Sequence, residues 1–512
     1  MPLRYPVRYG MTSTYKNRVI LFIAQSGGLP QSETTFAKVL QNNGYTTGLI
    51  GKWHLGNDKD IRGDREHHPN RHGFDYFYGL PFTNLKDFNG RFLSLSESVI
   101  SSQYPNWMAY AAAALLGPVT ACLLLKYSKH AFSISNILLV SVLLNPIGFF
   151  SAIFIIQTSL PFINSVLMID GQVVEQPFLS LDSTERFVKE ANSFMTKAVQ
   201  SHQPFLCMIN FVKVRSYHMP SSKFKGKSRH GVYGDVVMEL DDGVGQVIQS
   251  LTRLGVRDNT LVYFTSDNGG HLEDMQEGQV SGGYNGLLRG GKGQGAKEGG
   301  IRVPTIISWP NVLPKNTEVR IPVSLMDLFP TILDAASIYS DKYDSQNKLD
   351  GKSLIPFLTG NSVTNDDHHR FLMHYCGSSL HGVTFTEDKD HVWKVYFYTP
   401  RYKNHYEDKC DYVCQCTSSH VVKHDPPQVF NMVMDIMEQT DLSQASDQQV
   451  KLKYQEIIKE VNCAVQDHEK SLSAAGPVES QFSFLNSLWR PNLQPCCSWS
   501  ALCNCRQNSR NL

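Results

Sequence analysis

The 512-residue chain carries 48 Lys and Arg against 47 Asp and Glu, which gives it a formal net charge of +1. Hydrophobic residues make up 41% of the chain, which is enough for large cores and excludes a mainly disordered protein. The near-neutral charge excludes a general nucleic-acid-binding protein, because such proteins carry a basic excess. At about 150 residues per domain, we expect roughly two to four structural units.

The first predicted elements are a helix and a strand. Residues 32–43 have the apolar spacing of a helix with Ser32 as its N-cap, and the pattern of residues 45–56 indicates a strand. Lys52 and His54 are two residues apart, so a strand would place both side chains on one face. A lysine beside a histidine suits an anionic group, although an ordinary surface pair would show the same pattern.

The middle of the chain contains two long uncharged runs. Residues 107–125 and 131–169 contain no Asp, Glu, Lys or Arg, and the short basic segment 126–130 separates them. A membrane-spanning helix needs about 20 apolar residues, so we expect a transmembrane helical hairpin at 106–163 in a lipid bilayer. The positive-inside rule places the turn in the cytosol and both flanks on the lumenal or exterior side, and we expect a membrane of the endoplasmic reticulum or secretory pathway. A buried pair of core helices is the alternative.

A second helix–strand unit ends in candidate metal ligands. Residues 235–254 have amphipathic helical spacing, and the apolar strand 260–265 follows them. Such a strand indicates a parallel sheet covered on both faces, in which functional groups lie at the carboxyl ends of strands. Asp267 and Asn268 lie there and offer oxygen ligands suited to Ca²⁺ or Mg²⁺. A plain Asp-Asn-Gly turn is the alternative.

A glycine-rich loop and clustered cysteines complete the candidate features. Lys292 lies in the sequence GGKGQG, where glycines allow a close backbone approach and the lysine supplies charge to an oxyanion. The spacing is not that of a nucleotide-binding P-loop. The 11 cysteines are an odd number, and two clusters near the C-terminus indicate disulfides, with zinc as the alternative. These clusters are Cys410, Cys414 and Cys416, and Cys496, Cys497, Cys503 and Cys505.

Together these segments resemble the sulfatase family. Residues 44–55 match the second signature of that family almost position for position. The likeness extends from residue 4 to the C-terminus and is strongest to the group that contains steroid sulfatase and arylsulfatases D, E, F and H. The stretches that carry it include GLIGKWHLG, GKSRHGVYGD, YFTSDNGGHLE, YNGLLRGGKG, EGGIRVP, LMDLFPTI and WRPNLQPCC.

The resemblance implies an α/β fold of the alkaline-phosphatase type, with a mixed sheet flanked by helices. It implies a catalytic domain at 1–105 and 164–370, the transmembrane hairpin inserted at 106–163, and a smaller disulfide-rich C-terminal subdomain at 371–512. The implied activity is hydrolysis of aryl or steroid sulfate esters with formylglycine and Ca²⁺. The implied disulfides are Cys376–Cys416, Cys410–Cys414, Cys496–Cys503 and Cys497–Cys505, with Cys122, Cys207 and Cys463 as free thiols.

The resemblance also implies roles for individual residues. Lys52, His54 and Lys292 would contact the sulfate or the formylglycine, and Asp267 and Asn268 would bind Ca²⁺. The lysines and a Lewis-acidic calcium ion together would offset the charge that builds on the sulfuryl oxygens.

The chain departs from the family pattern in two places. It contains no Cys-x-Pro-Ser-Arg motif, the source of formylglycine, and residues 1–10 are not the apolar run of a signal peptide. We therefore expect an N-terminally truncated chain that is inactive as written. On the strand expected at 204–215, Lys213 and Arg215 stand where the family has two histidines. Arg215 could hold sulfate but, with a pKa above about 12, could not act as a general acid; a shifted alignment would use His218.

Other classes of function stay open at this point. One is a membrane-anchored pseudoenzyme that binds a sulfated ligand or a protein partner, which the missing motif and Arg215 favour. Another is a phosphatase or phosphodiesterase of the same superfamily, which would need a Ser or Thr nucleophile at a two-metal site that the sequence does not display. A transporter is not favoured, since neither uncharged run contains a charged residue.

Overall fold

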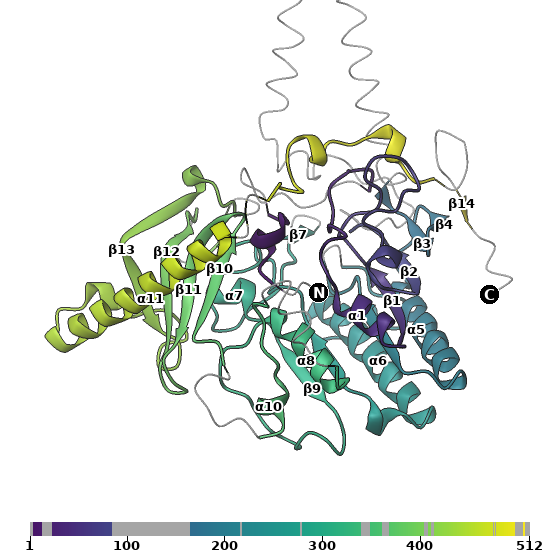
Figure 1. The fold of residues 1–512 in the computed structure, drawn as a ribbon, viewed down its shortest axis with the longest axis horizontal. Coiled ribbons are helices and arrows are strands. Elements are labelled where there is room, and N and C mark those ends of the chain that lie inside the picture. Colours follow the sequence, from purple (N-terminus) through teal and green to yellow (C-terminus); the bar gives the residue numbers. More distant parts are fainter. Residues whose placement is uncertain are drawn as a thin grey trace, which may run out of the picture.

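The computed structural model describes residues 4–12, 23–83, 164–215, 218–276, 279–338, 349–360, 368–403, 408–410, 414–474, 476, 478–496 and 505–506. The transmembrane hairpin expected at 106–163 lies outside these residues. Within them, every helix is too short or too polar to cross a bilayer. The ribbon shows a large domain around a mixed sheet and a smaller domain on an antiparallel sheet (Figure 1).

The large domain is built on a six-stranded mixed sheet with the strand order β14–β4–β3–β2–β1–β5. The central strand β1 runs parallel to its neighbours β2 and β5, whereas β3, β4 and β14 make antiparallel pairs. The expected α/β architecture with a mixed sheet is therefore confirmed. The strands are β1 (Thr46–Lys52), β2 (Tyr76–Leu80), β3 (Leu167–Ile169), β4 (Gln172–Gln176), β5 (Phe205–Asn210) and β14 (Cys505–Arg506).

Helices cover both faces of this sheet. The main helices of the large domain are α1 (Phe36–Asn42), α5 (Ser183–Gln200), α6 (Gly231–Arg253) and α8 (Leu328–Ala335). On one face, Phe187 of α5 and Leu251 of α6 share a buried cluster with Ile50 of β1. On the other face, Phe36 of α1 and Leu333 of α8 share a buried cluster with Leu49 of β1. Neighbouring strand residues point to opposite faces, so β1 is apolar on both, and each fully buried side chain of this size contributes about 1.5–3 kcal/mol.

The large domain also contains short strands and short helices, and 3₁₀ turns occur along the whole described chain. Two small antiparallel sheets, β6–β9 and β7–β8, stand apart from the large sheet. Their strands, with the short helices, are β6 (Val262–Thr265), β7 (Met275–Gln276), β8 (Gln279–Val280), β9 (Thr305–Ser308), α7 (Glu298–Ile301) and α10 (Ile355–Leu358). The 3₁₀ turns are Pro6–Tyr9, Pro69–His72, Arg257–Asn259, Leu325–Asp327, Ser418–His420, Leu442–Gln444, Leu485–Ser487 and Pro491–Leu493.

Two local predictions need correction. The first helix begins at Phe36, and its N-cap is Thr35 rather than Ser32, because the Thr35 hydroxyl accepts a hydrogen bond from the Lys38 amide at 3.0 Å. The apolar strand β6 pairs antiparallel with β9 instead of joining the parallel strands. An apolar run predicts a strand, but it carries no information about the partner of that strand or its direction.

The smaller domain is a four-stranded antiparallel sheet with one long helix against it (Figure 1). Ile457 and Val461 of that helix share a buried core with Val383 and Val429 of the sheet. The chain then returns to the large domain, where Leu493 joins the core and β14 pairs with β4. The elements are β10 (Phe371–Cys376), β11 (Ser379–Thr386), β12 (Val392–Pro400), β13 (Val421–Asn431) and α11 (Gln448–Ala474).

The cysteine predictions are confirmed wherever both side chains are described. Two predicted pairs and two predicted free thiols are present; they are Cys376–Cys416 and Cys410–Cys414, and Cys207 and Cys463. Cys496 is disulfide-bonded too, but its partner is not among the described side chains, so its pairing with Cys503 stays a prediction. The Cys497–Cys505 pair and the free Cys122 involve side chains outside the described ones.

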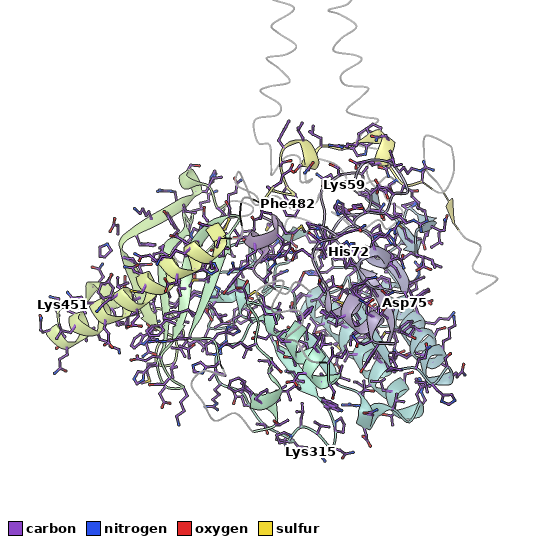
Figure 2. The ribbon with its side chains drawn as sticks, viewed as in Figure 1. Lys59, His72, Asp75, Lys315, Lys451 and Phe482 are labelled. Carbon is purple, nitrogen blue, oxygen red and sulfur yellow. A yellow bond between two sulfur atoms is a disulfide. The ribbon has the colours of Figure 1, made fainter. Side chains whose placement is uncertain are left out.

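Two histidines are buried inside the large domain. The His68 ring lies edge-on to Phe77 and the His72 ring lies beside Trp53, with centroids 5.1 Å and 5.7 Å apart. Burial lowers the pKa of His68 to about 3 and that of His72 to about 4. Both imidazoles are therefore neutral in the folded protein. Figure 2 shows His72 within the body of the large domain, in contrast to Lys451 at the outer end of α11.

We expect the folded protein to lose stability as the pH falls below about 6.5, the pKa of histidine in an unfolded chain. Between that pH and the lowered folded-state pKa values, the unfolded state binds more protons, so acid favours unfolding. From pH 7 to pH 5, each of these histidines should remove about 2 kcal/mol from the free energy of unfolding. Urea denaturation at pH 7, 6 and 5 measures this loss.

The variant His72→Phe keeps an aromatic ring beside Trp53 and should remove its own share of the pH dependence. The exposed His202 provides the matched control, since His202→Asn should leave the pH dependence as it is. An unchanged pH dependence in His72→Phe would contradict the assignment.

Candidate active site

The strand β1 carries Lys52 to the carboxyl edge of the large sheet. Lys52 is its last residue, and the Asn210 side chain at the end of β5 donates a hydrogen bond to the Lys52 carbonyl at 2.8 Å. The Lys52 Nζ lies 3.8 Å from the Asp267 carboxylate; the lysine side chain is 21% exposed and the aspartate 74%. Lys52, a predicted sulfate ligand, and Asp267, a predicted metal ligand, are therefore neighbours, although β1 and β6 belong to different sheets.

The glycine-rich loop lies against the loop that follows β6. The Lys292 amide donates a hydrogen bond to the Gly270 carbonyl at 2.9 Å. The Asn285 side chain joins the same backbone, because its Oδ1 accepts from the Gly270 amide at 2.8 Å and its Nδ2 donates to the Gly290 carbonyl at 2.8 Å. These bonds hold Lys292 beside the segment that contains Asp267.

Lys52, Lys292 and Arg215 share one electrostatic environment with Asp267. Burial lowers the pKa of Lys52 to about 8; Asp267 opposes this shift, and the charges of Arg215 and Lys292 add to it. Burial also lowers the pKa of Lys292, again opposed by Asp267 and reinforced by Arg215. Three cations thus lie near Asp267 in a partly desolvated region, and Asp274 also acts on Lys292. Such an excess of positive charge away from water favours an anion.

Arg215 lies in the turn beyond β5, since that strand ends at Asn210 rather than continuing through residue 215 as expected. Lys213 forms a separate ion pair, in which its Nζ donates hydrogen bonds to the Glu239 carboxylate at 2.6 Å and to the Leu181 carbonyl at 2.7 Å. The side chains of this ion pair are 3% and 4% exposed. Of the two basic residues predicted at the family histidine positions, Arg215 is therefore the one that acts on the lysines of the site.

Contrary to the prediction, His54 does not share a strand face with Lys52, and His218 lies in a separate aromatic contact. His54 has a φ of 61°, in the left-handed region, and β1 has already ended at Lys52, so the two do not share a strand face. The His54 ring packs edge-on against Phe82, with centroids 5.3 Å apart. His218 is buried with its ring 5.3 Å from that of Tyr233, and burial lowers its pKa.

Asp267 and Asn268 supply the oxygen donors that Ca²⁺ prefers. Their chemistry fits a calcium ion, and they would supply two of the roughly six to eight oxygens that the ion takes. Within the described part of the chain, the grouping with metal-ligand spacing is a different one, Glu273 with Cys410 and Cys414. Those two cysteines form a disulfide, so their sulfurs are not available to a metal.

Three supporting residues were not predicted from the sequence. Asn210, Glu239 and Asn285 each act through a hydrogen bond on Lys52, Lys213 or the backbone of the glycine-rich loop. For Asn210 and Asn285, a polar residue beside a strand end or a glycine-rich loop is the available sequence signal, whereas Glu239 lies within α6 and has no such signal. The signal is weak, because most loops contain such residues.

The chain matches known protein families along nearly all of its length. The sulfatase family model matches residues 3–338, and the model for the C-terminal region of aryl-sulfatase matches residues 367–505. Arylsulfatase D of Homo sapiens is 37% identical over 508 residues, which cover 99% of this chain and 82% of the relative. Steryl-sulfatase of Homo sapiens is 36% identical over 526 residues, which cover 99% of this chain and 85% of the relative.

The architecture agrees with these sequence matches. The crystal structure of the PsFucS1 sulfatase from Pseudoalteromonas sp. superposes with a TM-score of 0.64 at 22% identity, covering 93% of this chain and 79% of that one. At this identity the likeness shows the shared fold. Arylsulfatase H of Homo sapiens, at 38% identity over 507 residues, covers 98% of this chain and 86% of the relative. The chain therefore belongs to the sulfatase family, whose members are sulfuric ester hydrolases.

Proposed function

We propose that the cations at the carboxyl edge of the large sheet bind the sulfate group of a sulfate ester, in the manner of a sulfate-ester hydrolase. The observation that carries this proposal is the meeting of Lys52, Lys292 and Arg215 beside Asp267 in a partly desolvated region. A sulfate ester presents a delocalised negative charge that several N–H donors can share.

The residues of the chain would bind and orient the sulfate group. The ammonium groups of Lys52 and Lys292 would donate charge-assisted hydrogen bonds to the sulfuryl oxygens, and the planar guanidinium of Arg215 would add a two-pronged contact. Because the backbone hydrogen bonds hold these donors in place, they would stabilise charge on those oxygens with little reorganisation. A Ca²⁺ held by Asp267 and Asn268 would add Lewis-acid polarisation of the same oxygens.

Arg215 limits the chemistry that the site could perform. A guanidinium keeps its proton near neutral pH, so it could not protonate a departing alcohol. The 512 residues also contain no Cys-x-Pro-Ser-Arg motif that could yield formylglycine. On this proposal the chain as given binds sulfate esters with little or no turnover. A membrane-anchored pseudoenzyme for a sulfated ligand or protein partner is the second candidate, and Arg215 is the observation that favours it.

The proposed ligands are aryl or steroid sulfate esters. The support for this class is the similarity to proteins named arylsulfatase D, arylsulfatase H and steryl-sulfatase. The proposed location is the lumenal side of the endoplasmic reticulum membrane, supported by the uncharged runs at 107–125 and 131–169. At that surface an apolar sulfate ester could reach the protein from the bilayer.

Binding of 4-nitrophenyl sulfate tests the proposed site. We expect calorimetry in a calcium-containing buffer to show binding, and both Lys52→Met and Lys292→Met to weaken it by roughly tenfold or more, because each removes a charge-assisted hydrogen bond. The matched control is Lys315→Met, since that exposed lysine lies at the lower edge of the view in Figure 2. Wild-type affinity in both site variants would contradict the proposal.

Release of 4-nitrophenol from the same compound tests for turnover. We expect little or no release from the purified chain in the presence of Ca²⁺, because no formylglycine motif is present. Absorbance of the nitrophenolate product measures the rate. Robust release would refute this expectation and require another nucleophile.

The site also depends on the close approach of two backbones at glycine. The Gly269 amide donates a hydrogen bond to the Gly300 carbonyl at 3.0 Å, and a Cβ added at Gly269 would overlap the Gly299 carbonyl oxygen. Only glycine leaves room for this contact. The contact keeps the loop of Asp267 and the loop of Lys292 together.

We expect Gly269→Ala to push these loops apart and to weaken binding of 4-nitrophenyl sulfate by roughly tenfold or more, since small displacements of binding groups have large effects. Gly245→Ala is the matched control, because a Cβ there meets open space on α6, and it should raise stability by about 0.5–1 kcal/mol. Calorimetry and thermal melting measure the two effects. Wild-type affinity in Gly269→Ala would show that the contact is dispensable.

A further inference from the structure

The glycine-rich loop around Lys292 has little capacity to fix its own shape. Gly290, Gly293 and Gly295 adopt positive φ angles of 77°, 80° and 65°. Glycine loses more conformational freedom on folding than any other residue, so the loop holds one shape only if contacts from elsewhere impose it. The structure supplies such contacts from the smaller domain.

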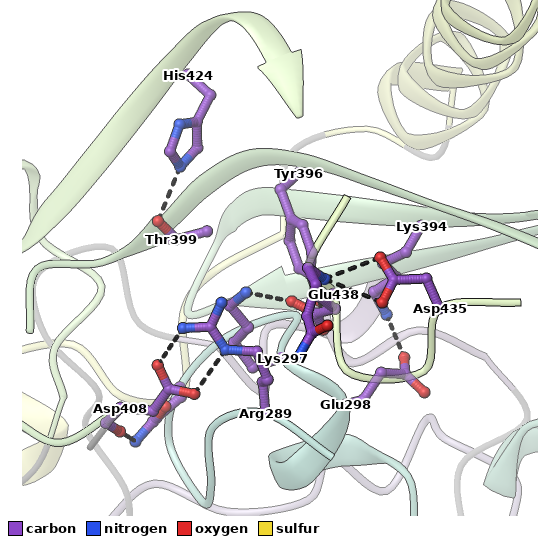
Figure 3. Close-up of polar contacts among 12 residues, drawn as sticks. Arg289, Lys297, Glu298, Lys394, Tyr396, Thr399, Asp408, His424, Asp435 and Glu438 are labelled. Carbon is purple, nitrogen blue, oxygen red and sulfur yellow. Dashed lines mark hydrogen bonds and ion pairs between the residues drawn. The ribbon is translucent and has the colours of Figure 1, made fainter. Parts of the chain in front are cut away.

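One of these contacts is a buried ion pair at Lys297. The Lys297 ammonium pairs with the Glu438 carboxylate, and the two side chains are 5% and 0% exposed. The Tyr396 hydroxyl donates to the other oxygen of Glu438 at 2.6 Å, and the Lys297 Nζ lies 4.2 Å from the centre of the Tyr396 ring (Figure 3). Tyr396 belongs to β12 and Glu438 follows β13, so both partners come from the smaller domain.

Two further ion pairs hold the ends of the loop. Arg289 donates two hydrogen bonds to the Asp408 carboxylate, at 2.9 Å and 2.6 Å. Lys394 of β12, fully buried, donates to the Glu298 carboxylate at 2.8 Å (Figure 3). The loop is therefore attached to partners beyond it on both sides of Lys292.

Glu438 combines burial with backbone strain. Its φ of 52° lies in the left-handed region, which few residues other than Gly, Asn and Asp adopt. A buried carboxylate is also costly unless it is paired. A residue that keeps both features is typical of positions that the surrounding structure holds for a functional reason.

We propose that Glu438 is a positioning residue for Lys292. Its pairing with Lys297 holds the end of the glycine-rich loop against β12, and the loop then presents the Lys292 ammonium beside Asp267. This inference rests on the proposed function, in which Lys292 binds the sulfate group. Glu438 acts only through Lys297 and the loop backbone.

The variant Glu438→Gln keeps the size of the side chain and an oxygen for Tyr396, but leaves Lys297 buried without a counter-ion. We expect calorimetry to show about tenfold weaker binding of 4-nitrophenyl sulfate. We also expect a several-fold change in the rate at which acetic anhydride labels Lys292, measured by peptide mass spectrometry, with exposed Lys315 as the internal reference. Lys297→Arg keeps the ion pair and should retain most of the affinity.

The matched control is Asp350→Asn, which breaks the similarly buried pair between Arg8 and Asp350, 2.7 Å apart and outside the loop. This control should lower the melting temperature but leave both the affinity and the labelling of Lys292 unchanged. Wild-type affinity and labelling in Glu438→Gln would overturn the proposal, and so would equal changes in Asp350→Asn. Should Glu438→Gln fail to fold, Tyr396→Phe removes one bond to Glu438 and must shift both measurements in the same direction.

The two measurements separate this inference from the proposed function. If the wild-type chain binds no 4-nitrophenyl sulfate, the proposed function fails, and the labelling of Lys292 alone decides the positioning role. If Lys292→Met weakens binding but Glu438→Gln changes neither measurement, only the positioning role fails.

Discussion

The backbone contact between the loop after β6 and the glycine-rich loop is the constraint on which the rest of the site depends. The glycines let the backbones of these two segments approach each other until the Lys292 amide donates a hydrogen bond to the Gly270 carbonyl at 2.9 Å. This approach brings the Lys292 ammonium and the Asp267 carboxylate into one region, which Lys52 enters from the end of β1. The shared electrostatic environment of these groups follows from that contact, because charges affect each other strongly only at short range or away from water.

Two lysines of the site carry their charge in a partly buried position. Burial is the main cause that lowers the pKa of Lys52 and Lys292; Asp267 opposes it, and the charge of Arg215 adds a smaller repulsion. An anionic ligand would stabilise these charges, which explains why lysines with lowered pKa values cluster at binding and catalytic sites. Lys213 shows the contrast, since its buried charge is already matched by Glu239 and needs no ligand.

The smaller domain contributes to the geometry of the site as well as to the bulk of the protein. Its strand β12 and the segment after β13 carry the partners of Lys297 and Glu298, and the chain after α11 returns to the core of the large domain through Leu493. Buried ion pairs of this kind add little net stability, because desolvation offsets most of their attraction. These ion pairs do fix the conformation of the glycine-rich loop, which needs such contacts because glycine leaves its backbone free to adopt many conformations.

The sequence by itself determined the family and, through the resemblance to that family, the mixed α/β architecture and the two disulfides of the smaller domain, Cys376–Cys416 and Cys410–Cys414. It also located Lys52 and Lys292, because both stand in motifs that are local in the chain. Apolar runs and glycine-rich stretches express the burial and backbone freedom of a single segment, and both can be recognised within a few neighbouring residues.

Only the tertiary structure decided which strand β6 pairs with, which of Lys213 and Arg215 reaches the lysines, and which residues hold the glycine-rich loop. It showed β6 paired with β9, Lys213 paired with Glu239, and Lys297 paired with Glu438. The two residues of the Lys213–Glu239 pair are 26 positions apart in the sequence, and those of the Lys297–Glu438 pair are 141 positions apart. Periodicity describes the environment along one element, whereas the choice of a distant partner depends on the packing of the whole chain.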